Sequence, residues 1–166
     1  MDSIATKHLD FSIRHATPDD AVLLLQFMRK LGAYQQMADE VTATEDSLRT
    51  LITTNRGEAF FGLLHGHPVG MLFFSPTCSA FTGRSGLFID AFILDDTVRH
   101  TGFGRTMMDY LSTLALQRGG QMLEWGCLDW NAPAITFYQK LGAYCLDIMR
   151  IYRLSPDNTR TSAERF

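Results

Sequence analysis

The stretch Arg99-His100-Thr101-Gly102-Phe103-Gly104 decides the fold of this chain. An apolar run over residues 87–94 precedes it, and a pattern with apolar side chains at steps of three and four residues follows it. We therefore expect a strand, a glycine loop and a helix, an order that directs unpaired backbone N–H groups at an anion. Gly102 and Gly104 lack a Cβ, which allows a phosphate to approach the main chain closely.

Positive charge brackets this glycine loop (residues 99–105), because Arg99 stands at its first position and Arg105 at its last. The pattern predicts a pyrophosphate site, although an ordinary turn explains two spaced glycines equally well. A nucleotide triphosphatase loop is excluded because no Gly-Lys-Ser or Gly-Lys-Thr ends the stretch. A dinucleotide-binding fingerprint is also excluded, since it needs three glycines near the start of a parallel sheet.

The composition fits one globular domain, because 166 residues that are 46% hydrophobic can bury an adequate core. The formal net charge of −3 argues against a nucleic acid as partner and permits a cationic substrate. The three cysteines, Cys78, Cys127 and Cys145, are widely spaced, which favours a reducing, cytoplasmic setting. We expect neither a signal peptide nor a membrane-spanning segment.

The order of elements predicts an α/β fold with a mixed sheet and helices on both faces. Strands and helices are expected in the order β-α-α-β-β-β-α-β-α-β, with the last strand over residues 143–154. We expect a flexible N-terminus over 1–10, one domain over 11–154 and a flexible tail over 155–166. His65 and His67 lie two residues apart, but without a third ligand nearby a turn is favoured over a metal site.

An arginine followed by two spaced glycines after an apolar strand resembles the acyl-CoA loop of the GNAT N-acetyltransferase superfamily. A second stretch, residues 124–138 with Leu141-Gly142-Ala143, is similar to the branch that contains diamine (spermidine/spermine) and thialysine acetyltransferases. Shorter matches lie at residues 13–17, 31–34, 44–45 and 81–84. The resemblance covers about residues 11–154. It implies the GNAT fold, in which helices flank a central mixed, mostly antiparallel sheet.

The resemblance also implies an activity: direct transfer of an acetyl group from acetyl-CoA, as co-substrate, to the primary amine of a small molecule. No metal is implied, and a homodimer is expected. The residues expected to hold acetyl-CoA are Phe92, Ile93, Leu94, Arg99, His100, Thr101, Gly102, Phe103, Gly104, Arg105, Asn131, Pro133, Ala134 and Tyr138. Within this set, a backbone N–H of residues 92–94 would stabilise the oxyanion that forms when the amine attacks.

Two residues match the family's catalytic positions. Tyr138 would reprotonate the departing CoA thiolate as general acid, and its alternative role is a packed aromatic beside Phe137. Asp90 takes the place of a glutamate that acts as base, often through water. Its alternative role is a solvent-facing strand residue, but an unpaired charge within an apolar run is costly to bury, which favours a position facing a cleft.

The residues expected to contact the acceptor amine are Tyr34, Gln35, Asp90, Glu124 and Trp125. Gln35 and Ile148 stand where polyamine enzymes of this branch carry glutamates, so a smaller amine or an amino-acid side chain fits at least as well as a long polycation. Two alternatives remain open at this point. One is a regulatory domain that binds acyl-CoA without catalysis, and the other is a protein or peptide acetyltransferase.

Overall fold

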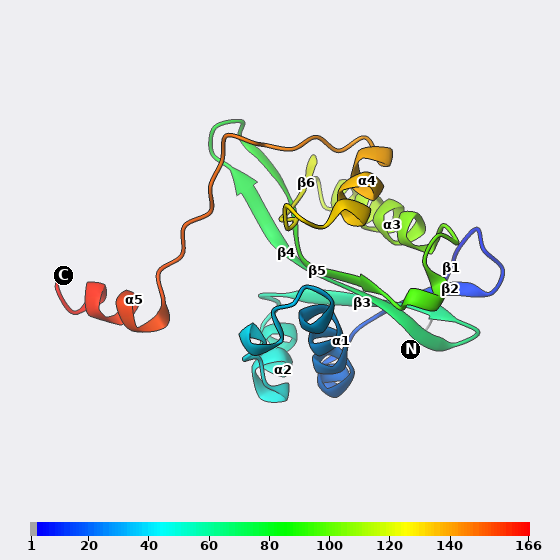
Figure 1. Cartoon of the computed structure of the whole chain (residues 1–166), viewed down its shortest axis with the longest axis horizontal. Coiled ribbons are helices and arrows are strands. Elements are labelled where there is room, and N and C mark those ends of the chain that lie inside the picture. Colours follow the sequence, from blue (N-terminus) through cyan, green and yellow to red (C-terminus); the bar gives the residue numbers. More distant parts are fainter. Residues whose placement is uncertain (1–2) are drawn as a thin grey trace. The chain divides into compact units, whose positions relative to one another are not determined.

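A mixed sheet organises the part of the chain that this computed structural model describes, residues 3–166. Its six strands lie side by side in chain order (Figure 1). Neighbouring strands are antiparallel except for β5 and β6, which are parallel. The strands are β1 (Ile4–Ala5), β2 (Phe11–His15), β3 (Glu58–Leu64), β4 (His67–Ser79), β5 (Arg84–Leu94) and β6 (Met122–Trp125). The predicted mixed, mostly antiparallel sheet is confirmed.

Helices connect these strands and continue the chain beyond them. The α-helices are α1 (Ala21–Tyr34), α2 (Glu45–Thr53), α3 (Phe103–Gln117), α4 (Ala132–Lys140) and α5 (Pro156–Ala163), and 3-10 helices cover Pro18–Asp20, Ala38–Glu40 and Asp96–Val98. Within residues 3–166, no helix combines the length and the apolar character needed to cross a bilayer. The chain divides into two compact units, one ending at Trp130 and the other beginning at Asn131, and each is described by itself.

Different helices cover the two faces of the sheet, as two adjacent phenylalanines of β3 demonstrate. Side chains alternate between the faces along a strand, so Phe60 and Phe61 point to opposite sides. The ring of Phe60 lies 5.2 Å from that of Tyr110 on α3, whereas the ring of Phe61 lies 5.9 Å from that of Phe27 on α1. Figure 1 accordingly shows α1 and α2 on one side of the sheet and α3 on the other.

Helix α3 is required by the parallel pairing of β5 with β6, because two adjacent parallel strands need a crossover connection. Polar contacts fix this helix to its face of the sheet. Nε2 of His15 on β2 is hydrogen-bonded to the hydroxyl of Tyr110, and Arg118 donates two hydrogen bonds to the Glu58 carboxylate on β3. Burial lowers the pKa of His15, with smaller opposed effects from Glu58 and Arg118, and it raises the pKa of Tyr110.

The strand expected over residues 143–154 is not formed, which corrects the predicted element order. No sheet ladder includes these described residues, and they follow α4 as turns and irregular chain. A β-rich sequence becomes a strand only when a neighbouring strand supplies backbone hydrogen bonds, and the described chain provides none here. The segment instead carries exposed apolar side chains, among them Tyr144, Ile148 and Tyr152.

Both ends of the chain contain short elements where the sequence predicted flexible segments. Ile4 and Ala5 pair with Ile13 and Ser12 of β2, and Pro156–Ala163 forms α5, whose first turn is capped by Ser155. Residues 1–2 lie outside the described part of the chain. The flexibility of the two ends and the single domain over 11–154 stay predictions.

The half-buried His15 predicts a folded state that loses stability in acid. Because its pKa is lowered in the folded state, folding favours neutral imidazole, and the stability this provides is present above the unfolded pKa of about 6.5. That stability is lost as the pH falls from there through the folded pKa. His15→Gln keeps a hydrogen-bonding group but does not titrate. We expect urea denaturation between about pH 7 and pH 5 to show a smaller loss of unfolding free energy for His15→Gln than for the unmodified chain. Equal losses would contradict this role of His15.

Candidate functional site

Strand β5 contains a β-bulge at the one carboxylate of its apolar run. Phe73 of β4 pairs with Ala91 and Phe74 pairs with Ile89, so Asp90 between them has no partner on β4. A bulge leaves the extra residue unpaired and redirects its side chain. Asp90 is exposed between buried neighbours on either side. This exposure is compatible with both roles considered for Asp90, a base that faces a cleft and a solvent-facing strand residue. The bulge explains how an apolar strand can carry this charge.

One edge of β5 has no strand neighbour in the described chain beyond this bulge. The parallel ladder with β6 runs from Gly86 paired with Met122 to Ile89 paired with Trp125, where β6 ends. On that edge no strand of the described chain pairs with residues 90–94. The expected oxyanion donors at residues 92–94 therefore lie on a stretch of β5 that has a strand neighbour, β4, on one side only.

The glycine loop has the geometry that an anion site needs. A 3-10 turn over Asp96–Val98 leads into it, and Gly102 occupies the N-cap of α3 with a φ of +91°. This left-handed conformation favours glycine, since it has no Cβ to clash with the backbone. The hydroxyl of Thr101 donates a 2.7 Å hydrogen bond to the carbonyl of Val98, which closes the loop on itself. The first N–H groups of α3, which have no intrahelical acceptors, follow directly.

His100 also adopts a left-handed conformation, with a φ of +65°. A residue with a Cβ is strained there by roughly 1–2 kcal/mol. His100 is exposed, so its side chain lies in solvent.

The residues that support the loop from behind could not be recognised in the sequence. The His8 ring packs edge-on against the ring of Phe103 at 5.1 Å, and its Nε2 lies 3.1 Å from the buried hydroxyl of Thr106. A Cβ added at Gly102 would lie 3.5 Å from the same ring. Phe11 stacks on Phe103 at 4.2 Å. The apolar character of Phe11 was visible in the sequence, but nothing local indicated that His8 would meet the loop.

The two arginines of the loop differ in how they are held. The Arg99 guanidinium forms a 2.8 Å ion pair with Asp96 and stacks over the ring of Tyr34 at 4.6 Å. Arg105 lies 4.0 Å from Asp109, one turn along α3, and its side chain is 54% exposed. The structure thus joins Arg99, expected on the cofactor side, to Tyr34, expected on the acceptor side.

The remaining acceptor residues of this unit fall at two places. Tyr34 is the last residue of α1 and Gln35 is its C-cap, both half-buried. Glu124 and Trp125 are the last two residues of β6, and Trp125 pairs with Ile89, the neighbour of Asp90. The parallel ladder therefore brings the end of β6 beside the bulge. The sequence did not show this proximity.

The second compact unit holds the four other predicted site residues. Asn131 is buried and caps α4, where its side-chain oxygen accepts a 3.3 Å hydrogen bond from the backbone N–H of Ala134, as expected for a helix cap. Pro133 lies in the first turn of α4. Tyr138 is half-buried on the same helix, with its ring 5.4 Å from that of Phe137. Both roles considered for Tyr138 are compatible with this position.

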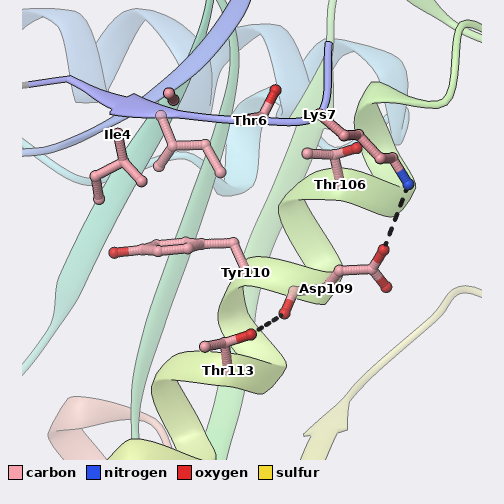
Figure 2. A pocket seen from close by; sticks show the side chains of 9 residues that line it. Ile4, Thr6, Lys7, Thr106, Asp109, Tyr110 and Thr113 are labelled. Atoms are coloured by element: carbon pink, nitrogen blue, oxygen red, sulfur yellow. Dashed lines mark hydrogen bonds and ion pairs between the residues drawn. The ribbon is translucent and has the colours of Figure 1, made fainter.

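A surface cavity of about 210 Å³ lies between β1 and α3 (Figure 2), and none of the residues that line it is among those expected to bind acetyl-CoA or the acceptor. Its lining includes Lys7 and Asp109, whose charged groups are 3.9 Å apart. Thr113 donates a hydrogen bond to the carbonyl of Asp109, and Tyr110 is hydrogen-bonded to His15. Among residues 3–166, no group of three or more His, Cys, Asp or Glu side chains is placed to hold a metal ion.

Known proteins resemble this chain over most of its length. The model of the acetyltransferase (GNAT) family matches residues 24–143. A thialysine N-epsilon-acetyltransferase of Caenorhabditis elegans is 31% identical, over 78% of this chain and 80% of the relative. An L-ornithine N5-acetyltransferase of Arabidopsis thaliana is 23% identical, over 92% and 88%. The crystal structure of an aminoglycoside acetyltransferase from a soil metagenomic sample, in complex with sisomicin, superposes with a TM-score of 0.74 at 17% identity, over 88% of this chain and 97% of that one.

The chain belongs to the GNAT acetyltransferase family, whose members use acetyl-CoA as co-substrate. It is an N-acetyltransferase, and its relatives include enzymes named for small amines. The solved structure supports the fold alone. The thialysine acetyltransferase relatives confirm the predicted likeness to the diamine and thialysine branch.

The parallel pairing of β5 with β6, which brings the end of β6 beside the bulge at Asp90, can be tested by substitution. A Cβ added at Gly86 would lie 2.1 Å from the carbonyl oxygen of Met122, so β6 would have to shift. We expect Gly86→Ala to lower the unfolding free energy by about 1–3 kcal/mol in urea titrations. Gly126→Ala is the matched control, because a Cβ there meets nothing within 4 Å, and its effect should stay within about 0.5 kcal/mol. Equal effects of the two variants would contradict the pairing.

Proposed function

We propose that this chain transfers an acetyl group from acetyl-CoA to the primary amine of a small molecule by direct attack. The acceptor is a diamine, a polyamine, thialysine or a similar amino-acid amine. One observation carries the proposal: β5 presents an exposed carboxylate at a bulge and a one-sided edge, and then leads directly into a glycine loop at a helix N-terminus. The names of the thialysine and ornithine relatives support the choice of amine.

The glycine loop and β5 would contact different parts of acetyl-CoA. The backbone of residues 100–105 would hold the pyrophosphate, because the N-terminus of α3 directs N–H groups and a positive dipole end at an anion. Arg105 would add positive charge from its exposed side chain. A backbone N–H of residues 92–94 would donate to the oxygen that becomes negative during attack. Asn131, Pro133 and Ala134 at the start of α4 would line the CoA channel.

Proton transfers would fall to two side chains. A free alkylamine has a pKa of about 10.4 and must lose a proton before it can attack. Asp90 would accept that proton, directly or through a positioned water, since its carboxylate is exposed. Tyr138 would return a proton to the departing thiolate. Tyr34, Gln35, Glu124 and Trp125 would contact the acceptor.

A phenylalanine at position 138 tests the acid role. We expect Tyr138→Phe to lower kcat about 10²- to 10⁴-fold, the range for losing a general acid, with an unchanged Kd for acetyl-CoA in calorimetry. Phe137→Leu is the control on the same helix and should keep most of kcat. The assay is release of CoA thiol with diamines, polyamines, thialysine, ornithine and lysine as acceptors. Turnover equal to that of the unmodified chain would show that Tyr138 is a packing residue.

The acceptor panel also separates the remaining interpretations. Turnover with one class of small amine supports the proposal and names the acceptor. Acetyl-CoA binding without turnover of any small amine, together with acetylation of a peptide panel, would replace it with a peptide acceptor.

We further propose that the chain acts as a homodimer in the cytoplasm. The exposed apolar side chains of residues 144–154 support a dimer, because contiguous apolar surface is typical of interaction sites. The three cysteines form no disulfide and are exposed, which is compatible with a reducing compartment.

Light scattering tests the dimer. We expect a mass of twice the 18.7 kDa of one chain. Ile148→Lys should reduce it to a single chain, since a charge buried at an apolar interface is costly. Leu116→Lys alters an exposed apolar side chain on α3 and serves as the control. A monomeric mass for the unmodified chain at micromolar concentration would contradict the proposal.

A further inference from the structure

The guanidinium of Arg99 is engaged on three sides in the structure. Its Nη2 lies 2.8 Å from a carboxylate oxygen of Asp96, and its Nε donates to the carbonyl of Leu94 at 3.4 Å. Its central carbon lies 4.6 Å from the centroid of the Tyr34 ring. The side chain is only 31% exposed. The guanidinium of Arg99 therefore already has partners within the protein, unlike a solvent-exposed arginine available to bind a phosphate.

Helix α1 is tied to the connection between β5 and the glycine loop by a second contact as well. Lys30, one turn before Tyr34, donates a 2.8 Å hydrogen bond to the carboxylate of Asp95. Both contacts place a cation near the C-terminal end of α1, where the helix dipole favours positive charge. The last turn of α1 and residues 95–99 are thus joined by two neighbouring pairs.

The chain beyond Tyr34 is fixed by a helix-ending turn. The N–H of Met37 donates to the carbonyl of Gly32, and the N–H of Gln36 donates to that of Ala33. Gln36 adopts a φ of +59°, which completes the turn in the left-handed conformation. The backbone of Tyr34 and Gln35 is therefore set by α1, and the guanidinium of Arg99 lies over the Tyr34 ring.

We propose that Arg99 is a positioning residue that acts through Tyr34 on acceptor binding, and that it does not serve as a pyrophosphate ligand. A planar guanidinium can stack on an aromatic ring and donate sideways to Asp96 and Leu94 at the same time, which lysine cannot do. Arg105, at the other end of the loop sequence, supplies the charge for the phosphates. The inference rests on the proposed function, because it assumes that Tyr34 contacts the acceptor.

The nuclear magnetic resonance signal of the Arg99 Nε–H group tests, without an acceptor, whether Arg99 stays on the Tyr34 ring and does not bind the pyrophosphate. Stacking on Tyr34 shifts the nearby protons of Arg99 upfield, and Tyr34→Leu should remove that shift. We expect the upfield shift to persist when the chain is saturated with acetyl-CoA. Loss of the shift on saturation would show that the guanidinium leaves the ring for the phosphates, which would overturn the proposal.

Kinetics with thialysine as acceptor test whether Arg99 acts on acceptor binding through Tyr34. Arg99→Lys and Tyr34→Leu should each raise the KM for thialysine at least fivefold and leave the calorimetric Kd for acetyl-CoA within twofold. The double variant should be no worse than the poorer single variant, because both remove one contact. Arg105→Gln is the matched control and should weaken acetyl-CoA binding while preserving the KM for thialysine.

Other results would contradict the proposed role of Arg99 or the proposed function. A tenfold rise in the acetyl-CoA Kd for Arg99→Lys but not for Tyr34→Leu would make Arg99 a phosphate ligand. Multiplicative effects in the double variant would remove the link between the two residues. If the unmodified chain fails to bind acetyl-CoA, the proposed function fails instead, and the stacking of Arg99 on Tyr34 is judged by the Nε–H signal of the free protein.

Discussion

Strand β5 is paired on both edges as far as Ile89 and on one edge beyond it, and the candidate site depends on that change. The parallel neighbour β6 requires a crossover, which α3 provides, and the N-terminus of α3 carries the glycine loop. The bulge at Asp90 falls one residue after the last pair with β6. The Asp90 carboxylate, the stretch of β5 with one strand neighbour and the glycine loop therefore follow one another along the chain between residues 90 and 105.

The loop itself is held from two directions. On one side, His8 and Phe11 pack against Phe103 behind Gly102. On the other, α1 is joined to the preceding connection through Lys30 and Arg99. An anion site of backbone N–H groups works only when those groups are fixed before the anion arrives, because reorganisation would consume binding energy. The strained φ of His100 persists for the same reason, since the surrounding contacts determine the course of the loop.

The sequence predicted the features that depend on local patterns. Two spaced glycines and an apolar period of three and four residues located the loop and α3. The bulge at Asp90 depends on the register between β4 and β5, which no short stretch encodes. The stacking of Arg99 on Tyr34 joins residues 65 positions apart and was missed for the same reason. The strand over residues 143–154 was wrongly predicted, because β-rich composition does not supply the partner that a strand needs.

The proposed function depends most on binding of the acetyl-CoA pyrophosphate by the backbone of the glycine loop. The most direct measurement follows the amide resonances of Gly102 and Gly104 during titration with acetyl-CoA and, separately, with acetyl-pantetheine, which lacks the pyrophosphate. We predict that both resonances move with acetyl-CoA and stay in place with acetyl-pantetheine, because only acetyl-CoA carries the pyrophosphate that these N–H groups would bind. Saturable binding of acetyl-CoA that leaves both resonances unmoved would contradict it.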